Sequence, residues 1–243
     1  VMAKAPNRKP KDTAPVVCTS KQAIATEEGL KQIASDYGQF PNVFVWVSAL
    51  NEQSATQAQL LAYGRLVQRL AAKGARPRAF YGGAFSVGLG TAGLTGLSPG
   101  ICYSESKDVA QAPTGGGFPI RYYVPLNRAK VALPNAARFF ASNPDLACDC
   151  AACRPIFPAP STRRGPRPDL AEAIQEMAAM EANRHFMLVR AREMQQVGTL
   201  SPSALAAKLE SDARKAEGRS TQVYRVPHAH LVVWSRVYSR LNQ

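Results

Sequence analysis

The sequence predicts an α/β fold, with parallel strand–helix units in its first half and a mainly helical, zinc-binding region in its second half. Short apolar stretches alternate with amphipathic ones from residue 15 to about residue 106, and helical patterns dominate from residue 169 onward. Three of the five cysteines also fall within one short stretch, "CDCAAC". The 243 residues are enough for one large domain or two small ones.

Strands and helices are expected to alternate through the first half. Apolar stretches predict strands at 15–20, 42–50 and 77–83, and a strand with its loop at 96–106. Amphipathic patterns predict helices between them, at 26–38, 54–74 and 84–93. Because helices separate successive strands, we expect a parallel sheet, either part of a barrel or a small wound sheet.

The pattern changes after this segment. We expect a turn at 112–119, a strand at 120–126, a short helix at 135–147 and a proline-rich basic loop at 154–168. A long helix should follow from Asp169 to about Val197. The next helix is expected at 201–218, with Ser201 as its N-cap, Pro202 at its first position and Gly218 at its end.

These elements define three predicted parts of the chain. They are a basic flexible tail at 1–15, a βα-barrel-like domain at 16–140 and a zinc-binding helical region at 141–243. The tail lacks the apolar centre of a signal peptide, and no later segment approaches the apolar length of a membrane helix. We therefore expect a cytoplasmic protein that does not enter a membrane.

The charge balance indicates which partners to consider. Thirty Lys and Arg residues against seventeen Asp and Glu residues give a net charge of +13. Such an excess favours polyanions, most simply tRNA or DNA, because basic side chains neutralise phosphates and release counterions. Acidic lipid surfaces, or a generally basic soluble protein with no polyanionic partner, are the alternatives.

The cysteines at positions 148, 150 and 153 have the spacing C-x-C-x-x-C. A disulfide among them would close only a very short loop, so a reduced thiolate cluster is the better interpretation. A structural Zn²⁺ site needs a fourth ligand, which must be another cysteine or a histidine. Among His185, His228 and His230 we choose His185, because a histidine on the predicted long helix can reach back to the cysteine loop.

The cluster followed by a helical histidine resembles the zinc site of the tRNA-guanine transglycosylase family, whose members exchange bases in tRNA or in DNA. Cys148, Cys150, Cys153 and His185 carry the resemblance, together with "HFMLVRAREM" and the βα units that end in "GLTGLSPGICYSES". The resemblance implies a partial or degenerate (β/α) barrel with a zinc site on its C-terminal side. It also implies guanine or 7-deazaguanine exchange on a nucleic acid.

Two aspartates of that family have no counterpart here. The nucleophile would lie in "LSPGICYSESKD", where the nearest carboxylates are Glu105 and Asp108, and "YGGAFSVG" lacks the acid of the family's "DSGGF"-like motif. Base exchange needs a carboxylate that attacks the sugar and a second group that handles protons. Glu105 is the candidate nucleophile and Asp108 its partner, although solvated loop carboxylates are the ordinary alternative.

Further residues are candidates for contact with substrate or nucleic acid. Gly82 and Gly83 would let a purine or phosphate approach the backbone, unless they only form a tight turn, and Tyr103 is a third substrate-binding candidate. Tyr122 and Tyr123 could stack on bases or belong to the core. The candidate phosphate-binding arginines, for which solvated charge is the alternative, are Arg163, Arg164, Arg167, Arg236 and Arg240.

Three function classes stay open. The chain is either a base-exchanging enzyme or a non-catalytic, zinc-containing, nucleic-acid-binding subunit whose protein partner supplies the missing catalytic residues. The absent aspartates favour the subunit, whereas Glu105 and the glycines favour the enzyme. A barrel-derived protein that binds an unrelated small molecule is the third possibility.

Overall fold

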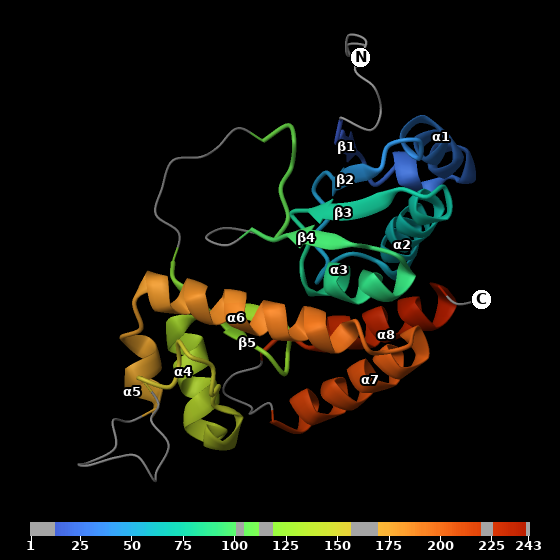
Figure 1. Cartoon of the computed structure of the whole chain (residues 1–243). Helices are drawn as coiled ribbons and strands as arrows, with labels where there is room; N and C mark the ends of the chain where they lie inside the picture. Colours follow the sequence, from blue (N-terminus) through green and yellow to red (C-terminus); the bar gives the residue numbers. More distant parts are fainter. Residues whose placement is uncertain (1–12, 101–104, 112–118, 157–169, 220–225, 242–243) are drawn as a thin grey trace.

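A four-stranded parallel sheet flanked by helices forms the first half of the chain (Figure 1). The computed structural model describes residues 13–100, 105–111, 119–156, 170–219 and 226–241. The strands pair in the order β1-β2-β3-β4. Their bounds are Val16–Thr19 for β1, Asn42–Val47 for β2, Arg76–Phe80 for β3 and Gly96–Ser98 for β4. The predicted parallel sheet is confirmed, and no closed barrel is seen among the described residues.

Strand and helix periodicities account for this half of the fold. In β2 the side chains of Val43, Val45 and Val47 are buried and alternate with more exposed ones, as expected for a strand with one face in the core. Helices α1 (Glu27–Tyr37) and α2 (Gln57–Ala72) pack against each other beside the sheet (Figure 1). The short helix α3 (Ala84–Gly88) follows β3, and a 3₁₀ turn (Leu89–Ala92) continues it.

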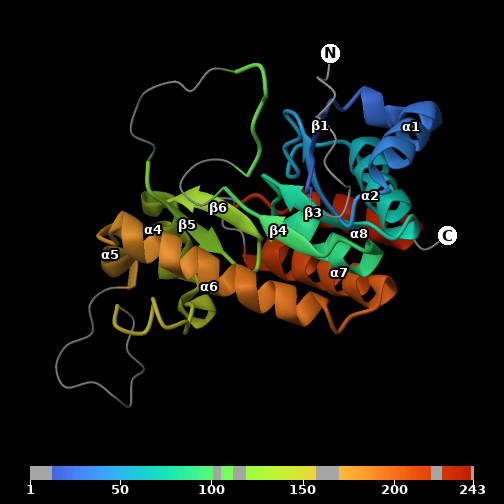
Figure 2. The same cartoon turned by 45° about the horizontal axis from the view of Figure 1, so that its top comes forward.

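An antiparallel hairpin begins the second half. Strand β5 (Arg121–Val124) was predicted, but its partner β6 (Ala129–Ala132) was not, because "AKVA" is too short to show a strand pattern. Helix α4 (Leu133–Ser142) follows directly and leads into the cysteine loop. Figure 2 shows the hairpin next to β4 and α6.

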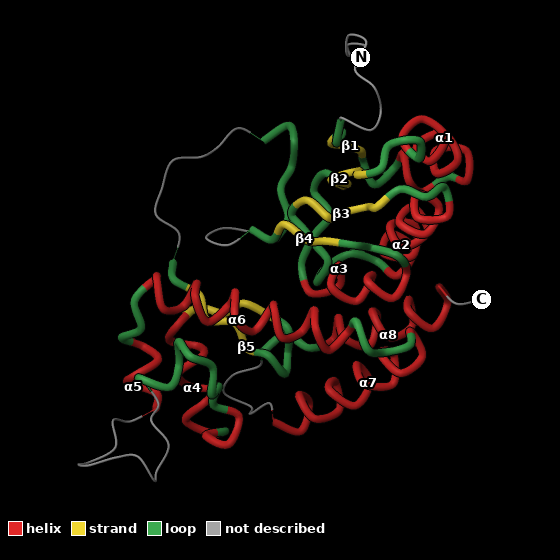
Figure 3. Tube along the Cα trace, viewed as in Figure 1, coloured by secondary structure: helices red, strands yellow, loops and turns green. Residues whose placement is uncertain are grey.

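The remaining chain is helical, as expected, but with two differences (Figure 3). The predicted helix from Asp169 to Val197 is divided into α5 (Leu170–Gln175) and α6 (Ala179–Val197), because Met177 turns into the core between them. The helix α7 (Pro202–Arg219) has the predicted cap, in which the Ser201 hydroxyl accepts from the Ala204 amide at 3.2 Å. A last helix, α8 (Ala229–Leu241), was not assigned from the sequence.

The described residues form two large hydrophobic cores and a small third one, which contains Tyr123, Phe186 and Val189. The first core joins the parallel sheet to α2, α3, α7 and α8, and includes Val45, Leu66, Leu205 and Trp234. The second core joins the hairpin, α4, α5 and the cysteine loop. Residues from both halves of the chain therefore build the first core. No helix in the described part of the chain has the length and apolarity needed to cross a membrane.

Candidate metal centre and carboxylate pocket

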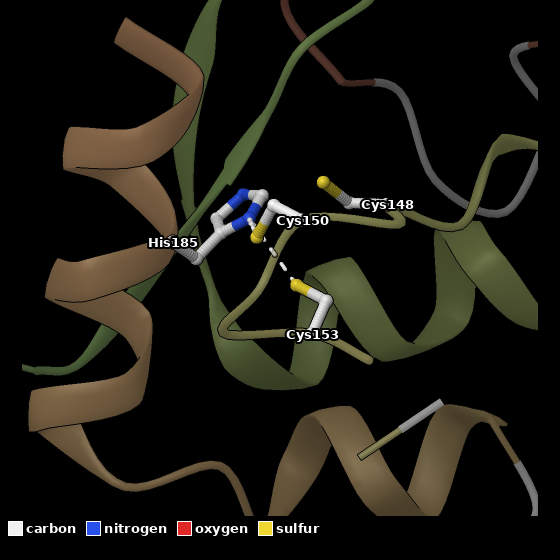
Figure 4. A group of neighbouring side chains, drawn as sticks. All are labelled: Cys148, Cys150, Cys153 and His185. Atoms are coloured by element: carbon white, nitrogen blue, oxygen red, sulfur yellow. Dashed lines mark hydrogen bonds between the residues drawn. The ribbon is translucent and has the colours of Figure 1, made fainter. Parts of the chain in front are cut away.

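The cysteine loop and α6 bring four metal-ligating side chains together (Figure 4). The sulfur atoms of Cys148, Cys150 and Cys153 and one ring nitrogen of His185 all lie within 4.8 Å of one another. The Nδ1 atom of His185 is 3.5 Å from the Cys150 sulfur and 3.3 Å from the Cys153 sulfur. The predicted group of four is therefore present and can bind a metal ion.

The backbone of the loop turns so that its cysteines face one way. The amides of Cys153 and Arg154 both donate to the Cys150 carbonyl oxygen at 2.9 Å, which forms a tight helical turn. Asp149 points outward, where its carboxylate accepts from Arg192 on α6 at 2.9 Å. The loop is thus joined to α6 both through His185 and through this exposed ion pair.

His185 is oriented by groups outside the cysteine cluster. Its Nε2–H donates to the Tyr123 carbonyl oxygen at 2.8 Å, which assigns the ring proton to Nε2 and leaves the Nδ1 lone pair facing the sulfurs. The ring also stacks on Tyr122, with 4.2 Å between ring centroids. Such support, which fixes the tautomer and the ring plane, is typical of metal-ligating histidines.

The thiols are arranged so that one of them ionises easily. A hydrogen bond from Cys153 lowers the pKa of Cys148 to about 4, with a further lowering from His185, whereas burial opposes it. The same hydrogen bond and burial raise the pKa of Cys153. Three sulfurs and one imidazole nitrogen are soft and borderline donors, which suit a tetrahedral thiophilic ion.

The other two histidines lie elsewhere. His230 on α8 donates from Nε2 to the Asn127 carbonyl oxygen at 3.0 Å, and burial lowers its pKa to about 4. His228 precedes α8 and its Nδ1 lies 3.1 Å from the Val226 carbonyl oxygen. Neither of them belongs to the group of four. The structure instead places His185, the histidine chosen from the sequence, beside the three cysteines.

A second site lies where the strands of the parallel sheet end. A small pocket, with a cavity volume of about 80 Å³, is lined by the carboxylates of Glu52 and Glu105, by Gly83 and by the cations Arg121 and Lys130. Glu52 follows β2 and Gly83 follows β3, which places the pocket at the carboxyl edge of the sheet. This edge is the usual position for ligand sites in parallel α/β sheets.

Glu105 enters the pocket in contact with a buried arginine. The Nη2 group of Arg190, on α6, donates to Glu105 Oε1 at 2.6 Å. Asp108 is placed differently, because its partly exposed carboxylate accepts from the Ser48 hydroxyl and the Ala110 amide at 3.0 Å. These two hydrogen bonds lower the pKa of Asp108, and its side chain does not line the pocket.

Glu52 is the pocket carboxylate that the sequence did not reveal. One carboxylate oxygen accepts from the Gly83 amide at 2.9 Å and from the Ser86 hydroxyl, and the other accepts from the Phe85 amide at 2.8 Å. Burial nevertheless raises the pKa of Glu52 to about 7, although these hydrogen bonds oppose the rise. The available signal was its place in the loop that follows the apolar strand β2, which ends at Val47.

Gly82 and Gly83 both lie too close to neighbouring atoms to carry a side chain. A Cβ atom at Gly83 would lie 2.5 Å from Glu52 Oε2, so a glycine is needed where the carboxylate meets the backbone. A Cβ atom at Gly82 would lie 2.4 Å from Leu97 Cδ1, so this glycine allows packing of β3 against β4. In the described structure, the group that approaches the Gly83 backbone is therefore the Glu52 carboxylate.

The candidate nucleic-acid contacts fall into three groups. Tyr103 and the arginines at 163, 164 and 167 lie outside the described residues. Arg236 and Arg240 are exposed on α8 and are available to a partner. Tyr122 and Tyr123 are fully buried and belong to the core, so they are unavailable for stacking on bases.

No family model matches the chain, and neither a curated protein nor a solved structure is significantly similar to it. The functional argument therefore depends on the geometry of the two sites.

Proposed function

We propose that the chain acts in guanine or 7-deazaguanine base exchange on nucleic acid, with Glu105 as the nucleophile. One observation carries the proposal: Glu105 lines a pocket at the carboxyl edge of a parallel sheet, beside a second, buried carboxyl group. The resemblance of the cysteine–histidine group to the transglycosylase zinc site supports it. The net charge of +13 provides the attraction to a polyanionic substrate.

The proposed reaction uses the pocket carboxylates in two roles. A Glu105 oxygen bonds to the sugar C1′ as the C1′–N bond to the base breaks, and the departing base keeps the electron pair. The incoming base then displaces Glu105 and forms the new C1′–N bond. Glu52, with its pKa of about 7, gives a proton to the departing base and takes one from the incoming base. Glu52 replaces Asp108 in this role because Glu52 lines the pocket.

We further propose that the metal ion is Zn²⁺ and that its role is structural. Cys148, Cys150, Cys153 and His185 would supply all four ligands of a tetrahedral site. Such a site has no open position for substrate. The ion therefore holds the cysteine loop against α6, and the chemistry is assigned to the pocket.

Glu105→Gln is expected to abolish base exchange. The substitution removes the nucleophilic charge with little change in shape, so incorporation of labelled guanine into tRNA or DNA should fall by at least about a thousandfold. The covalent complex between protein and nucleic acid should also disappear. Glu28→Gln, at an exposed position on α1, is the matched control and should behave like the wild type.

Two further variants assign the proton-handling role. Loss of exchange in Glu52→Gln but not in Asp108→Asn supports Glu52, and the reverse result returns the role to Asp108. Failure of the wild type to incorporate any base, while it binds nucleic acid normally, contradicts the enzymatic proposal for the chain acting alone.

A non-catalytic subunit is the second candidate function. The pairing of Glu105 with Arg190 favours it, because a neutralised carboxylate is a weaker nucleophile. In this role the chain would present nucleic acid to a protein partner that carries the missing aspartates. Base exchange that appears only when such a partner is added would identify this function.

Binding to nucleic acid is expected to depend strongly on salt. Because phosphate contacts release counterions, affinity for tRNA and for duplex DNA should fall steeply between about 50 and 200 mM salt. Replacing both Arg236 and Arg240 with Ala should reduce the slope of log affinity against log salt by about 2. Fluorescence anisotropy provides the measurement. Negligible binding to both nucleic acids at low salt would show that the positive charge has another role.

A further inference from the structure

Arg190 is a buried arginine to which the proposed chemistry gives no role. Only 2% of its surface is exposed, and its two terminal nitrogens contact two different carboxylates. Nη2 donates to Glu105 at 2.6 Å and Nη1 donates to Glu193 Oε2 at 2.8 Å. Since an arginine is buried at a high cost in solvation, it remains buried only where such pairs hold it in one orientation.

Aromatic rings fix the guanidinium from its sides. Its central carbon lies 4.9 Å from the Tyr123 ring centroid and 5.1 Å from the Phe186 ring centroid. The Tyr123 hydroxyl also donates to Glu193 Oε1 at 2.8 Å, so both oxygens of Glu193 are engaged. The guanidinium therefore cannot turn away from Glu105 without breaking several contacts.

The same tyrosine connects this arrangement with the metal group. Its carbonyl oxygen accepts from Nε2 of His185, while its ring and hydroxyl contact Arg190 and Glu193. His185, Arg190 and Glu193 all belong to α6, and Tyr123 belongs to β5. A metal ion bound to His185 would thus press α6 against the strand that orients the arginine.

We infer that Arg190 is a positioning residue for Glu105, and that the metal group holds Arg190 in place by fixing α6 against β5. Arg190 is the one hydrogen-bond partner that the described residues offer to the Glu105 side chain. The consequence for catalysis rests on the proposed function, in which Glu105 is the nucleophile. The mechanical consequence does not rest on that function: without Arg190, the segment 105–111 loses the ion pair that joins Glu105 to α6.

Hydrogen–deuterium exchange of residues 105–111 tests the inference independently of activity. In Arg190→Met we expect exchange in this segment to become about tenfold faster, while α2 and β2 keep their protection and the metal stays bound. General destabilisation would instead speed exchange in all three. Arg190→Lys should restore part of the protection, because an ammonium group can still pair with a carboxylate. Arg184→Met, at an exposed position of the same helix, is the matched control.

Base exchange provides the second measurement. We expect Arg190→Met to lower kcat and to leave KM for nucleic acid nearly unchanged, because the buried arginine contacts the nucleophile rather than the substrate. If the wild type shows no base exchange but segment 105–111 loosens in Arg190→Met, the proposed function fails and the positioning role stands.

Unchanged exchange of segment 105–111 in a folded, metal-bound Arg190→Met protein overturns the inference. If Arg190→Met does not fold, hydrogen–deuterium exchange of Tyr123→Phe tests the inference instead. This variant removes only the hydroxyl that donates to Glu193. A smaller acceleration confined to residues 105–111 is then expected. No acceleration in Tyr123→Phe contradicts the inference in the same way.

Discussion

Removal of the metal ion is expected to unfold the second core and to leave the first core folded. Cys150 and Cys153 are fully buried members of the second core, whereas the first core contains no metal ligand. Binding of Zn²⁺ to such sites contributes roughly 10 kcal/mol or more, which exceeds what a small core supplies by itself. Cys150→Ser should have nearly the same effect as a chelator.

The two cores can be followed separately. Both tryptophans of the chain, Trp46 on β2 and Trp234 in the first core, report on the sheet and the first core, and hydrogen–deuterium exchange of α4 reports on the second core. Elemental analysis should give one zinc ion per chain. Cys18→Ser, on β1, is the matched control and should keep the metal. Metal-free protein with an intact second core would contradict the structural role.

Glu52→Ala is expected to destabilise the first core by about 3 kcal/mol or more, because it leaves several buried donors without an acceptor. The donors are the amides of Gly83, Phe85 and Ser86 and the Ser86 hydroxyl. Denaturant unfolding followed by tryptophan emission measures the loss. Gly83→Ala should also destabilise the fold, but less so in the absence of Glu52, since its methyl group would meet the missing carboxylate. Strict additivity of the two substitutions would contradict this contact.

The raised pKa of Glu52 should make the stability of the fold depend on pH. The pKa of Glu52 is raised by burial from 4.5 to about 7, so the folded state holds this proton more tightly than the unfolded state does. Its favourable contribution is therefore complete below pH 4.5 and is lost as the pH rises through about 7. The difference in unfolding free energy between the wild type and Glu52→Gln should change by roughly 3 kcal/mol over this range. A difference that is independent of pH would show that Glu52 titrates normally.

The sequence predicted the elements whose periodicity or residue spacing is visible within a short stretch of chain. The period of two in β2 and the helical spacing in α2 were visible in the sequence, and so was the spacing of the three cysteines. The break between α5 and α6 was not visible, because it depends on the burial of Met177 in a core formed by distant residues. Strand β6 was missed because four residues give too little periodicity.

The candidate site was predictable to a similar degree. Cysteine spacing identified the metal group, since the chemistry of tetrahedral coordination restricts the choice of ligands. Glu52 could not be found in this way, because a carboxylate after a strand is usually solvated. Its surroundings include a residue from far along the chain, Trp234, whose indole donates to the Glu52 carbonyl oxygen at 2.9 Å.

The return of α8 to the sheet has a consequence for synthesis on the ribosome. Trp234 contacts the backbone at Glu52, the Tyr238 hydroxyl contacts the Phe85 carbonyl, and Gln68 on α2 donates to the Leu241 carbonyl at 2.6 Å. The part of α2 and the turn at α3 that pack against α8 therefore stay exposed until residues 229–241 have left the exit tunnel. The nascent first half therefore lacks part of its packing until α8 docks, and the wall of the carboxylate pocket that Trp234 forms is completed only at that point.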